Sequence, residues 1–331
     1  MNKDFTVLTT NFARINQGLR LLEDVVRFVF ADQELFQALK SLRKSLSQTQ
    51  AWFGSAHLIR GRSGLPAISQ TKDQDHPSFG LSLYSMIHAE AGKVCEGLSI
   101  LEQFSSVYAP THAFVFQKAR YQIFSLERDL LIRTPHFYLL QYCEQGMVYP
   151  ISDSVEELKD CVESGARMIQ LSDTKSNKEL VLKKTKELCR FLQKKYTEGK
   201  EKVVFLVHEY VDIAVQAPVD GIHIYKNTTP VSQVRYQLGS NKIISKRVSS
   251  VNDAQHLLFS GVDMLSFGSL FDGYQKNHRI FQEMEQFFQQ MSVSASAFGG
   301  ITPDNIEQVW STGCKNVGVT ESINNFFPKR G

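Results

Sequence analysis

The chain has 331 residues, of which 42% are hydrophobic, and a formal net charge of +3. This length accommodates two ordinary domains with sizeable cores. The small net charge, without a run of basic residues, argues against nucleic-acid binding. We expect no secretory signal and no membrane partner, because the first residues lack an apolar segment and no stretch approaches the ~18 apolar residues of a membrane span.

The five cysteines are widely spaced and form no C-x-x-C pair. This arrangement is typical of reduced thiols and predicts a cytoplasmic protein with neither a disulfide framework nor a zinc site.

The first 135 residues show helical periodicity and predict an all-α bundle domain. In the 12–31 region, Ile15, Leu19, Leu22 and Val26 follow the spacing of one apolar helix face. The same reasoning predicts further helices, and Gly, Pro, Ser and Asp clusters predict a loop over 54–79. The further helices are expected at 33–53, 83–107 and 113–132.

This half contains an internal repeat. NFARINQGLRLLEDVVRF (11–28) aligns with EAGKVCEGLSILEQFSSV (90–107), so that Gly18 matches Gly97 and Glu23 matches Glu102. A helical Gly costs about 1 kcal/mol relative to Ala, so two at equivalent positions indicate a close approach of helices. We therefore predict two helical hairpins packed as a four-helix bundle.

The second half alternates short apolar runs with amphipathic segments. Repeated βα units require parallel strands, and eight of them close into a (β/α)8 barrel, also called a TIM barrel. We predict this α/β barrel over 147–331, after a linker at 136–146, with a doubly wound open sheet as the alternative. The expected strands are 148–152, 168–172, 203–207, 221–225, 242–246, 264–268, 294–298 and 316–320.

Active sites of such barrels lie at the carboxyl ends of the strands, and phosphate often binds after strands 7 and 8. Strand 7 runs into FGGITPDN, where Gly299 and Gly300 would let the backbone approach an anion. Thr302 could cap a helix that starts at Pro303 and presents free N–H groups. Thr320 would contribute after strand 8. The alternative is an ordinary strand-to-helix turn.

Polar residues follow the other predicted strands and converge on the same rim. Glu209 and Asp173 could hold Mg²⁺ together with waters. Lys175, Arg247 and Lys276 could pair with phosphate or diphosphate. For His223, which lies within a strand, we favour a core position. The complete set of rim candidates is Asp153, Gln170, Asp173, Lys175, His208, Glu209, Lys226, Lys246, Arg247 and Lys276.

Residues 147–327 resemble the thiamine-phosphate synthase family, including its thiazole tautomerase relatives. The resemblance is carried by VYPISD, ESGARMIQLSD, VHEYVDIA and FGGITPDNI. The N-terminal half is similar to a helical domain fused ahead of thiamine-phosphate synthase in some bacteria. Relatives of that domain have been linked to hydroxymethylpyrimidine phosphate phosphorylation, although no glycine-rich nucleotide loop is evident in this half.

The resemblance implies an enzyme of thiamine biosynthesis that couples hydroxymethylpyrimidine diphosphate to thiazole phosphate and releases diphosphate. Its small-molecule partners would be this phosphorylated pyrimidine and thiazole, and its cofactor would be Mg²⁺. By alignment with the family, Gln170, Lys175 and Lys276 are the catalytic candidates and Glu209 is the metal candidate. His208 stands where the family has Asn.

Several family positions are changed. The first metal Asp aligns with Glu209 and the second with Thr228, which removes a carboxylate. The Arg of Gln-Leu-Arg aligns with Ser172, and Lys246 and Arg247 enter the Ser/Thr cluster after strand 5. Of the Thr-Pro-Thr-Lys loop, at 273–276 in this chain, only Lys276 survives, and the Ser after strand 8 is replaced by Glu321.

Three functions remain open at this point. The first is thiamine-phosphate synthesis at a divergent active site whose diphosphate and Mg²⁺ end is eroded, with Mg²⁺ bound weakly or lost. The second is a thiazole tautomerase-like reaction, which needs no diphosphate site. The third is a non-catalytic paralogue or partner that binds a phosphorylated ligand.

Overall fold

The computed structural model describes residues 4–54, 82–199, 201–226, 229–258, 260–273, 275–291 and 293–328. The chain divides into two compact units, one built mainly from residues 1–134 and the other mainly from residues 135–331.

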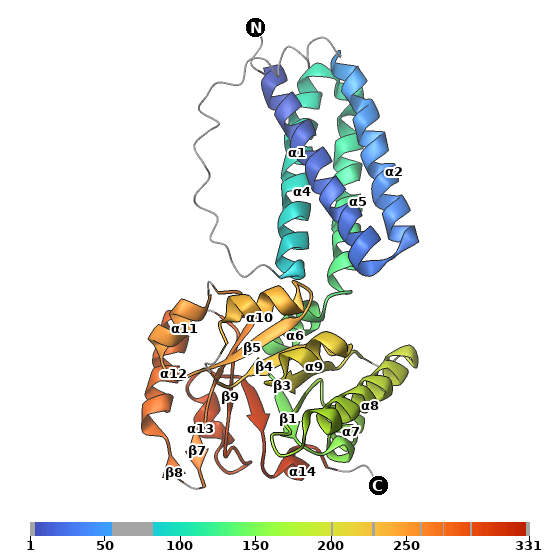
Figure 1. The fold of residues 1–331 in the computed structure, drawn as a ribbon. Helices are drawn as coiled ribbons and strands as arrows, with labels where there is room; N and C mark the ends of the chain where they lie inside the picture. Colours follow the sequence, from blue (N-terminus) through green and yellow to red (C-terminus); the bar gives the residue numbers. More distant parts are fainter. Residues whose placement is uncertain are drawn as a thin grey trace. The chain divides into compact units, whose positions relative to one another are not determined.

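The first unit is a bundle of long helices that run side by side (Figure 1). Its first helix begins at Asp4, earlier than the 12–31 region in which we predicted it, and most of the predicted 54–79 loop lies outside the described residues. The long helices are α1 (Asp4–Val25), α2 (Gln33–Thr49), α4 (Leu83–Tyr108) and α5 (Ala113–Leu131). The short ones are η1 (Val26–Phe30), η2 (Gln50–Phe53) and η4 (Pro110–His112).

The boundary between the first two long helices follows from local backbone chemistry. Ala31 adopts a left-handed conformation with φ of 53°, which ends the preceding helical turn. Asp32 then caps α2, because its side chain accepts a hydrogen bond from the backbone N–H of Leu35 at 3.0 Å.

The two repeats pack reciprocally across α1 and α4. A Cβ placed on Gly18 would lie 2.7 Å from Cγ2 of Val94, and one on Gly97 would lie 2.8 Å from Cγ1 of Ile15. Because Gly18 matches Gly97 and Ile15 matches Val94 in the repeat, the same contact is made twice with the helices exchanged. The predicted close approach at these two glycines is confirmed.

The matching acidic residues also have matching partners. Glu23 of α1 accepts hydrogen bonds from Nε and Nη2 of Arg43 in α2 at 2.5 and 3.0 Å. Glu102 of α4 accepts one from Nη2 of Arg120 in α5 at 3.2 Å. Each repeat therefore consists of a helical hairpin with an internal Glu–Arg pair.

The second unit is a closed barrel of eight parallel strands, and the predicted barrel is confirmed over the open sheet. Each predicted apolar run coincides with a strand, and helices surround the strands (Figure 1). The barrel strands are β1 (Val148–Ser152), β2 (Met168–Leu171), β3 (Val204–His208), β4 (Gly221–Ile224), β5 (Ile243–Val248), β6 (Met264–Phe267), β9 (Ala295–Phe298) and β10 (Asn316–Val319). The helices are α7 (Val155–Glu163), α8 (Lys178–Thr197), α9 (Val211–Gln216), α10 (Val231–Leu238), α11 (Val251–Leu258), α12 (His278–Gln290), α13 (Ile306–Trp310) and α14 (Ile323–Phe326).

A short antiparallel pair, β7 (Phe271–Asp272) with β8 (Gln275–Lys276), follows β6. Among the described residues, no helix is long and apolar enough to span a bilayer.

The segment 136–146, for which a linker was predicted, is instead helical. It forms α6 (Pro135–Gln145), the first element of the barrel unit. Leu139, Tyr142 and Cys143 are buried from this helix and belong to one apolar cluster with Met168 and Val204 inside the barrel. Helix α6 therefore packs at the amino-terminal ends of the strands.

Side chains alternate between two separate cores along each strand. On β3, Val204 and Leu206 lie in the interior cluster, whereas Phe205 and Val207 lie in the cluster between strands and helices. This alternation is the ordinary period of a β-strand. It places His208, two positions beyond Leu206, on the interior side at the carboxyl end.

Two turns that precede strands share one mechanism. Asp220 precedes β4 and accepts a hydrogen bond from the backbone N–H of Phe205 in the neighbouring strand at 3.0 Å. Asp263 precedes β6 and accepts one from Ile244 at 2.7 Å, and it also pairs with Arg235. The recurring Val-Asp before a strand therefore joins it to the preceding strand.

Candidate functional site

The interior at mid-barrel is closed by a chain of hydrogen-bonded side chains. The imidazole of His223 contacts the Ser245 hydroxyl at 2.9 Å, and this hydroxyl lies 3.1 Å from that of Ser266. The chain continues to Ser296 at 2.8 Å, which accepts from the Tyr149 hydroxyl at 3.2 Å. His223 is 2% exposed, which confirms its predicted core position. Burial and the nearby cationic groups lower its pKa to about 3, so it is neutral.

Three predicted site residues lie on the carboxyl-terminal side of the barrel and face its interior. They are Gln170 on β2, His208 on β3 and Arg247 on β5. Gln170 is 3% exposed and His208 is 9% exposed. Within the described part of the chain, Oε1 of Gln170 and Nδ1 of His208 have no hydrogen-bond partner. Burial lowers the pKa of His208, so this imidazole is neutral near pH 7.

Aromatic side chains that the motif analysis did not identify line the same region. Tyr225 and Phe298 contact each other with ring centroids 6.1 Å apart, and His208 lies 6.0 Å from Tyr225. The guanidinium of Arg247 lies 4.4 Å from the centroid of the Tyr225 ring. Strand alternation gives a signal for Tyr225, because it follows the inward-facing His223 by two positions. Phe298 is the first residue of the FGGITPDN motif, but the motif was interpreted through its glycines and not through this ring.

The Gly299–Gly300 turn packs tightly against the segment that follows β6. Gly299 and Gly300 have φ angles of 96° and 65°, which favour glycine. A Cβ on Gly299 would lie 2.8 Å from Cα of Ser269, and one on Gly300 would lie 2.7 Å from Cβ of Phe271. These glycines are therefore required by packing, whatever ligand the turn binds.

The prediction of a helix that starts at Pro303 is wrong. The residues after Thr302 form a turn, and the regular helix α13 begins at Ile306. The turn is organised by Asn305, whose side chain accepts from the Thr302 N–H and donates to the Gly300 carbonyl, both at 2.9 Å. The backbone N–H groups of Gly300 and Ile301 donate to no residue that the structure describes. A phosphate would therefore meet loop amides and not a helix terminus.

Asp173, a predicted magnesium candidate, has structural partners instead. It is 2% exposed, and its carboxylate lies 2.6 Å from the Lys184 ammonium. It also accepts backbone hydrogen bonds from Lys175 and Ser176 at 3.1 and 2.9 Å. Burial alone would raise the pKa of Asp173, but these hydrogen bonds hold it well below its usual range. Lys175 itself is exposed, with its ammonium 3.4 Å from Asp153.

Glu209, the predicted metal ligand, closes the loop after β4. Its Oε1 accepts hydrogen bonds from the backbone N–H groups of Tyr225 and Lys226. Glu209 has a φ of 61°, a left-handed conformation that is uncommon for this residue type. Thr228, its predicted counterpart, lies outside the described residues.

The carboxylates of Glu209 and Asp173 do not fit a two-carboxylate Mg²⁺ site. Glu209 has one oxygen bonded to two amides, and Asp173 is paired with Lys184. In the ranges that the structure describes, no group of three His, Cys, Asp or Glu side chains is placed to hold a metal ion.

The other rim candidates are exposed or have partners outside the inward-facing set. The Lys276 ammonium lies 3.9 Å from the centroid of the Phe281 ring of α12, and Thr320 is exposed. Lys226 is exposed, whereas Lys246 is 4% exposed and donates to the Lys226 carbonyl at 3.2 Å. Burial lowers the pKa of Lys246.

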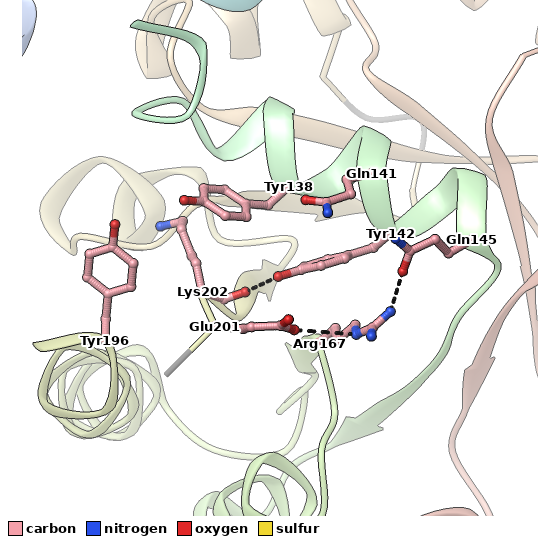
Figure 2. Close-up of a pocket in the computed structure, with 8 residues that line it drawn as sticks. All are labelled: Tyr138, Gln141, Tyr142, Gln145, Arg167, Tyr196, Glu201 and Lys202. Atoms are coloured by element: carbon pink, nitrogen blue, oxygen red, sulfur yellow. Dashed lines mark hydrogen bonds and ion pairs between the residues drawn. The ribbon is translucent and has the colours of Figure 1, made fainter. Parts of the chain in front are cut away.

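A hollow of about 260 Å³ lies at the opposite end of the barrel, where Arg167 and Lys202 precede β2 and β3 (Figure 2). Its charged groups are satisfied within the protein: Arg167 lies 3.6 Å from Glu201 and donates to Gln145, and Lys202 pairs with Asp220. This hollow is separate from the rim on which the predicted residues converge.

Residues 143–323, more than half of the chain, match the family described as thiamine monophosphate synthase. The chain belongs to this family. Residues 6–129 match the ThiD2 family.

Several relatives are named thiamine-phosphate synthase and resemble the whole chain. The protein from Nostoc punctiforme is 25% identical over 325 residues, which cover 96% of this chain and 89% of that protein. The protein from a Synechocystis strain is 25% identical over 326 residues, covering 96% and 90%. Thiamine phosphate pyrophosphorylase from Pyrococcus furiosus gives a TM-score of 0.48 at 23% identity and covers 54% of this chain and 88% of that structure.

Proposed function

We propose that this family member catalyses the coupling of hydroxymethylpyrimidine diphosphate to thiazole phosphate. In this reaction the bond between the pyrimidine methylene carbon and the diphosphate oxygen breaks. The thiazole nitrogen supplies the electron pair of the new C–N bond, and diphosphate leaves with the electrons of the broken bond. Full-length similarity to proteins named thiamine-phosphate synthase supports this assignment.

The observation that carries the proposal is the pair of inward-facing polar side chains with unpartnered atoms. Oε1 of Gln170 accepts no hydrogen bond from any described residue, and Nδ1 of His208 is also unpartnered. A buried polar atom without a partner costs about 1–3 kcal/mol, and a bound heteroaromatic ring with amino and ring-nitrogen groups would satisfy both atoms. Tyr225 and Phe298 supply aromatic surfaces for such a ring.

The phosphate of the thiazole substrate would bind at the turn after β9. The free N–H groups of Gly300 and Ile301 provide donors, and Asn305 holds this turn in place. Thr302 and Thr320 are the side chains we propose at the edge of this site. Lys175 and Lys276 are flexible cations that could reach the leaving group only after leaving Asp153 and Phe281, respectively.

The test is a coupling assay with purified full-length protein and both phosphorylated substrates, in which thiamine phosphate is measured by mass spectrometry. We expect turnover on the order of 1 s⁻¹ or faster. Gln170→Leu should lower kcat/KM at least tenfold, whereas Gln193→Leu on the exposed face of α8 should leave it unchanged. Absence of product from the folded wild type would exclude the proposal.

The unpartnered imidazole favours one second candidate, a thiazole tautomerase-like activity. Proton transfer within a thiazole phosphate carboxylate needs a neutral base and no diphosphate site, and His208 is buried with a lowered pKa. Isomerisation of that compound alone, lost in His208→Gln, would support this activity over coupling.

A further inference from the structure

Arg247 is a cation held in place without a charged partner. Its Nε donates to the Gly268 carbonyl at 2.6 Å, and its guanidinium stacks on the Tyr225 ring at 4.4 Å. Tyr225 is in turn fixed by its backbone N–H, which donates a hydrogen bond to the Glu209 carboxylate. A guanidinium fixed at Nε and on one face retains both terminal amino groups for a ligand.

Those two amino groups are unoccupied by the surrounding protein. In the described ranges, no carboxylate lies within ion-pair distance of Arg247, and neither Nη1 nor Nη2 donates to another residue. The terminal amino groups can therefore form the paired hydrogen bonds that guanidinium groups make with phosphate oxygens.

The position of Arg247 distinguishes diphosphate from the thiazole phosphate. It contacts Tyr225, which is bonded to Glu209, so it lies beside the loops where the family places its metal ligands. The turn at Gly299–Gly300, proposed for the phosphate monoester, has its own N–H donors after β9, on Gly300 and Ile301. At the family's metal position this chain has one carboxylate fewer, and Glu209, the one that remains, already accepts two backbone hydrogen bonds. Arg247, in contrast, has both terminal amino groups free.

We infer that Arg247 binds the diphosphate of the pyrimidine substrate directly and that this binding does not require a divalent cation. The inference rests on the proposed function. Tyr225 acts as a positioning residue that holds the guanidinium over the barrel mouth through its ring.

The experiment is calorimetric titration of the full-length protein with pyrophosphate, in EDTA and in Mg²⁺. The dissociation constants in the two conditions should agree within about twofold. Arg247→Gln should weaken binding at least tenfold in EDTA, because two charge-assisted hydrogen bonds are lost. Arg190→Gln, which removes the same charge from the exposed face of α8, should change binding less than twofold.

The role of Tyr225 is tested in the same titration. Tyr225→Phe keeps the ring and should bind pyrophosphate like the wild type, whereas Tyr225→Leu should weaken binding about threefold, since an exposed cation–π contact is worth about 0.5–1 kcal/mol. Rescue by Phe separates this role from a general requirement for bulk.

Two results would overturn the inference: loss of wild-type pyrophosphate binding in EDTA, or unchanged binding in folded Arg247→Gln. The first needs no variant and so does not depend on how a variant folds. The titration also involves no turnover. A protein that binds pyrophosphate in EDTA but forms no thiamine phosphate would contradict the proposed function and leave this inference standing.

Discussion

The helical bundle and the barrel both contain repeated sequence, but they differ in how many of their polar side chains are paired within the protein. In the bundle, Glu23 and Glu102 occupy equivalent sites and each pairs with an arginine of the following helix. In the barrel, Asp220 and Asp263 join adjacent strands at one end, whereas Gln170 and Arg247 at the other end retain free donors or acceptors. The comparison separates residues that are fully used by folding from residues that remain available to a ligand.

The two tryptophans of the chain allow the units to be followed separately. Trp52 lies in the bundle and Trp310 in the barrel, so Trp52→Phe and Trp310→Phe backgrounds report on one unit each. Urea unfolding in these two backgrounds therefore measures the stability of each unit.

The largest effect should come from Asp263 in the barrel. Asp263→Ala removes the carboxylate partner of the largely buried Arg235 guanidinium and the acceptor of the Ile244 N–H. We expect the free energy of unfolding to fall by about 3–5 kcal/mol. Asp304→Ala, at an exposed turn, should stay within about 0.5 kcal/mol of the wild type. Equal effects of both changes would contradict the structural role of Asp263.

The bundle should respond to glycine substitution with opposite signs at two sites of one helix. Gly97→Ala places a Cβ 2.8 Å from Ile15 and should cost about 1–3 kcal/mol through overpacking. Gly92→Ala meets nothing within 4 Å and should stabilise by about 0.5–1 kcal/mol. If Gly97→Ala also stabilised the bundle, close packing would not explain the repeated glycine.

Asp173 should make the barrel sensitive to acid. The pKa of this carboxyl is lower in the folded than in the unfolded protein, because Lys184 and the loop amides stabilise its charged form despite burial. Its contribution is therefore complete above the unfolded value of about 3.9 and is lost as the pH falls toward the folded value. Between about pH 5 and pH 3, Asp173→Asn should lose less stability than the wild type. Parallel pH profiles would show that Asp173 does not contribute.

The smallest expected difference separates the two Glu–Arg pairs of the bundle. Glu102→Gln should cost less than about 1 kcal/mol, because both partners are partly exposed and joined by one 3.2 Å contact. Glu23→Gln should cost more, since Glu23 is 6% exposed and accepts two hydrogen bonds from Arg43. The reverse order would mean that the sequence repeat does not preserve the energetics of the pair.

Sequence periodicity was sufficient for the architecture of both units. Short continuous apolar runs and helical stripes are local properties, so they predicted the eight strands and the long helices of the bundle. The repeated glycines also predicted the contact between α1 and α4, because a helical Gly is unfavourable unless another helix lies close. Helix α6 was missed. Its buried side chains pack against the amino-terminal ends of the barrel strands, and this contact exists only when the barrel has closed.

The sequence by itself determined which residues lie at the carboxyl ends of the strands, because strand order and alternation follow from the chain. It did not determine which of these side chains remain available to a ligand. Asp173 and Glu209 look like metal ligands in the sequence. In the structure, however, Asp173 pairs with Lys184, and Glu209 accepts hydrogen bonds from the Tyr225 and Lys226 amides. Only tertiary structure places Arg247 on Tyr225. The register between neighbouring strands decides which of their side chains meet, and the sequence does not specify that register.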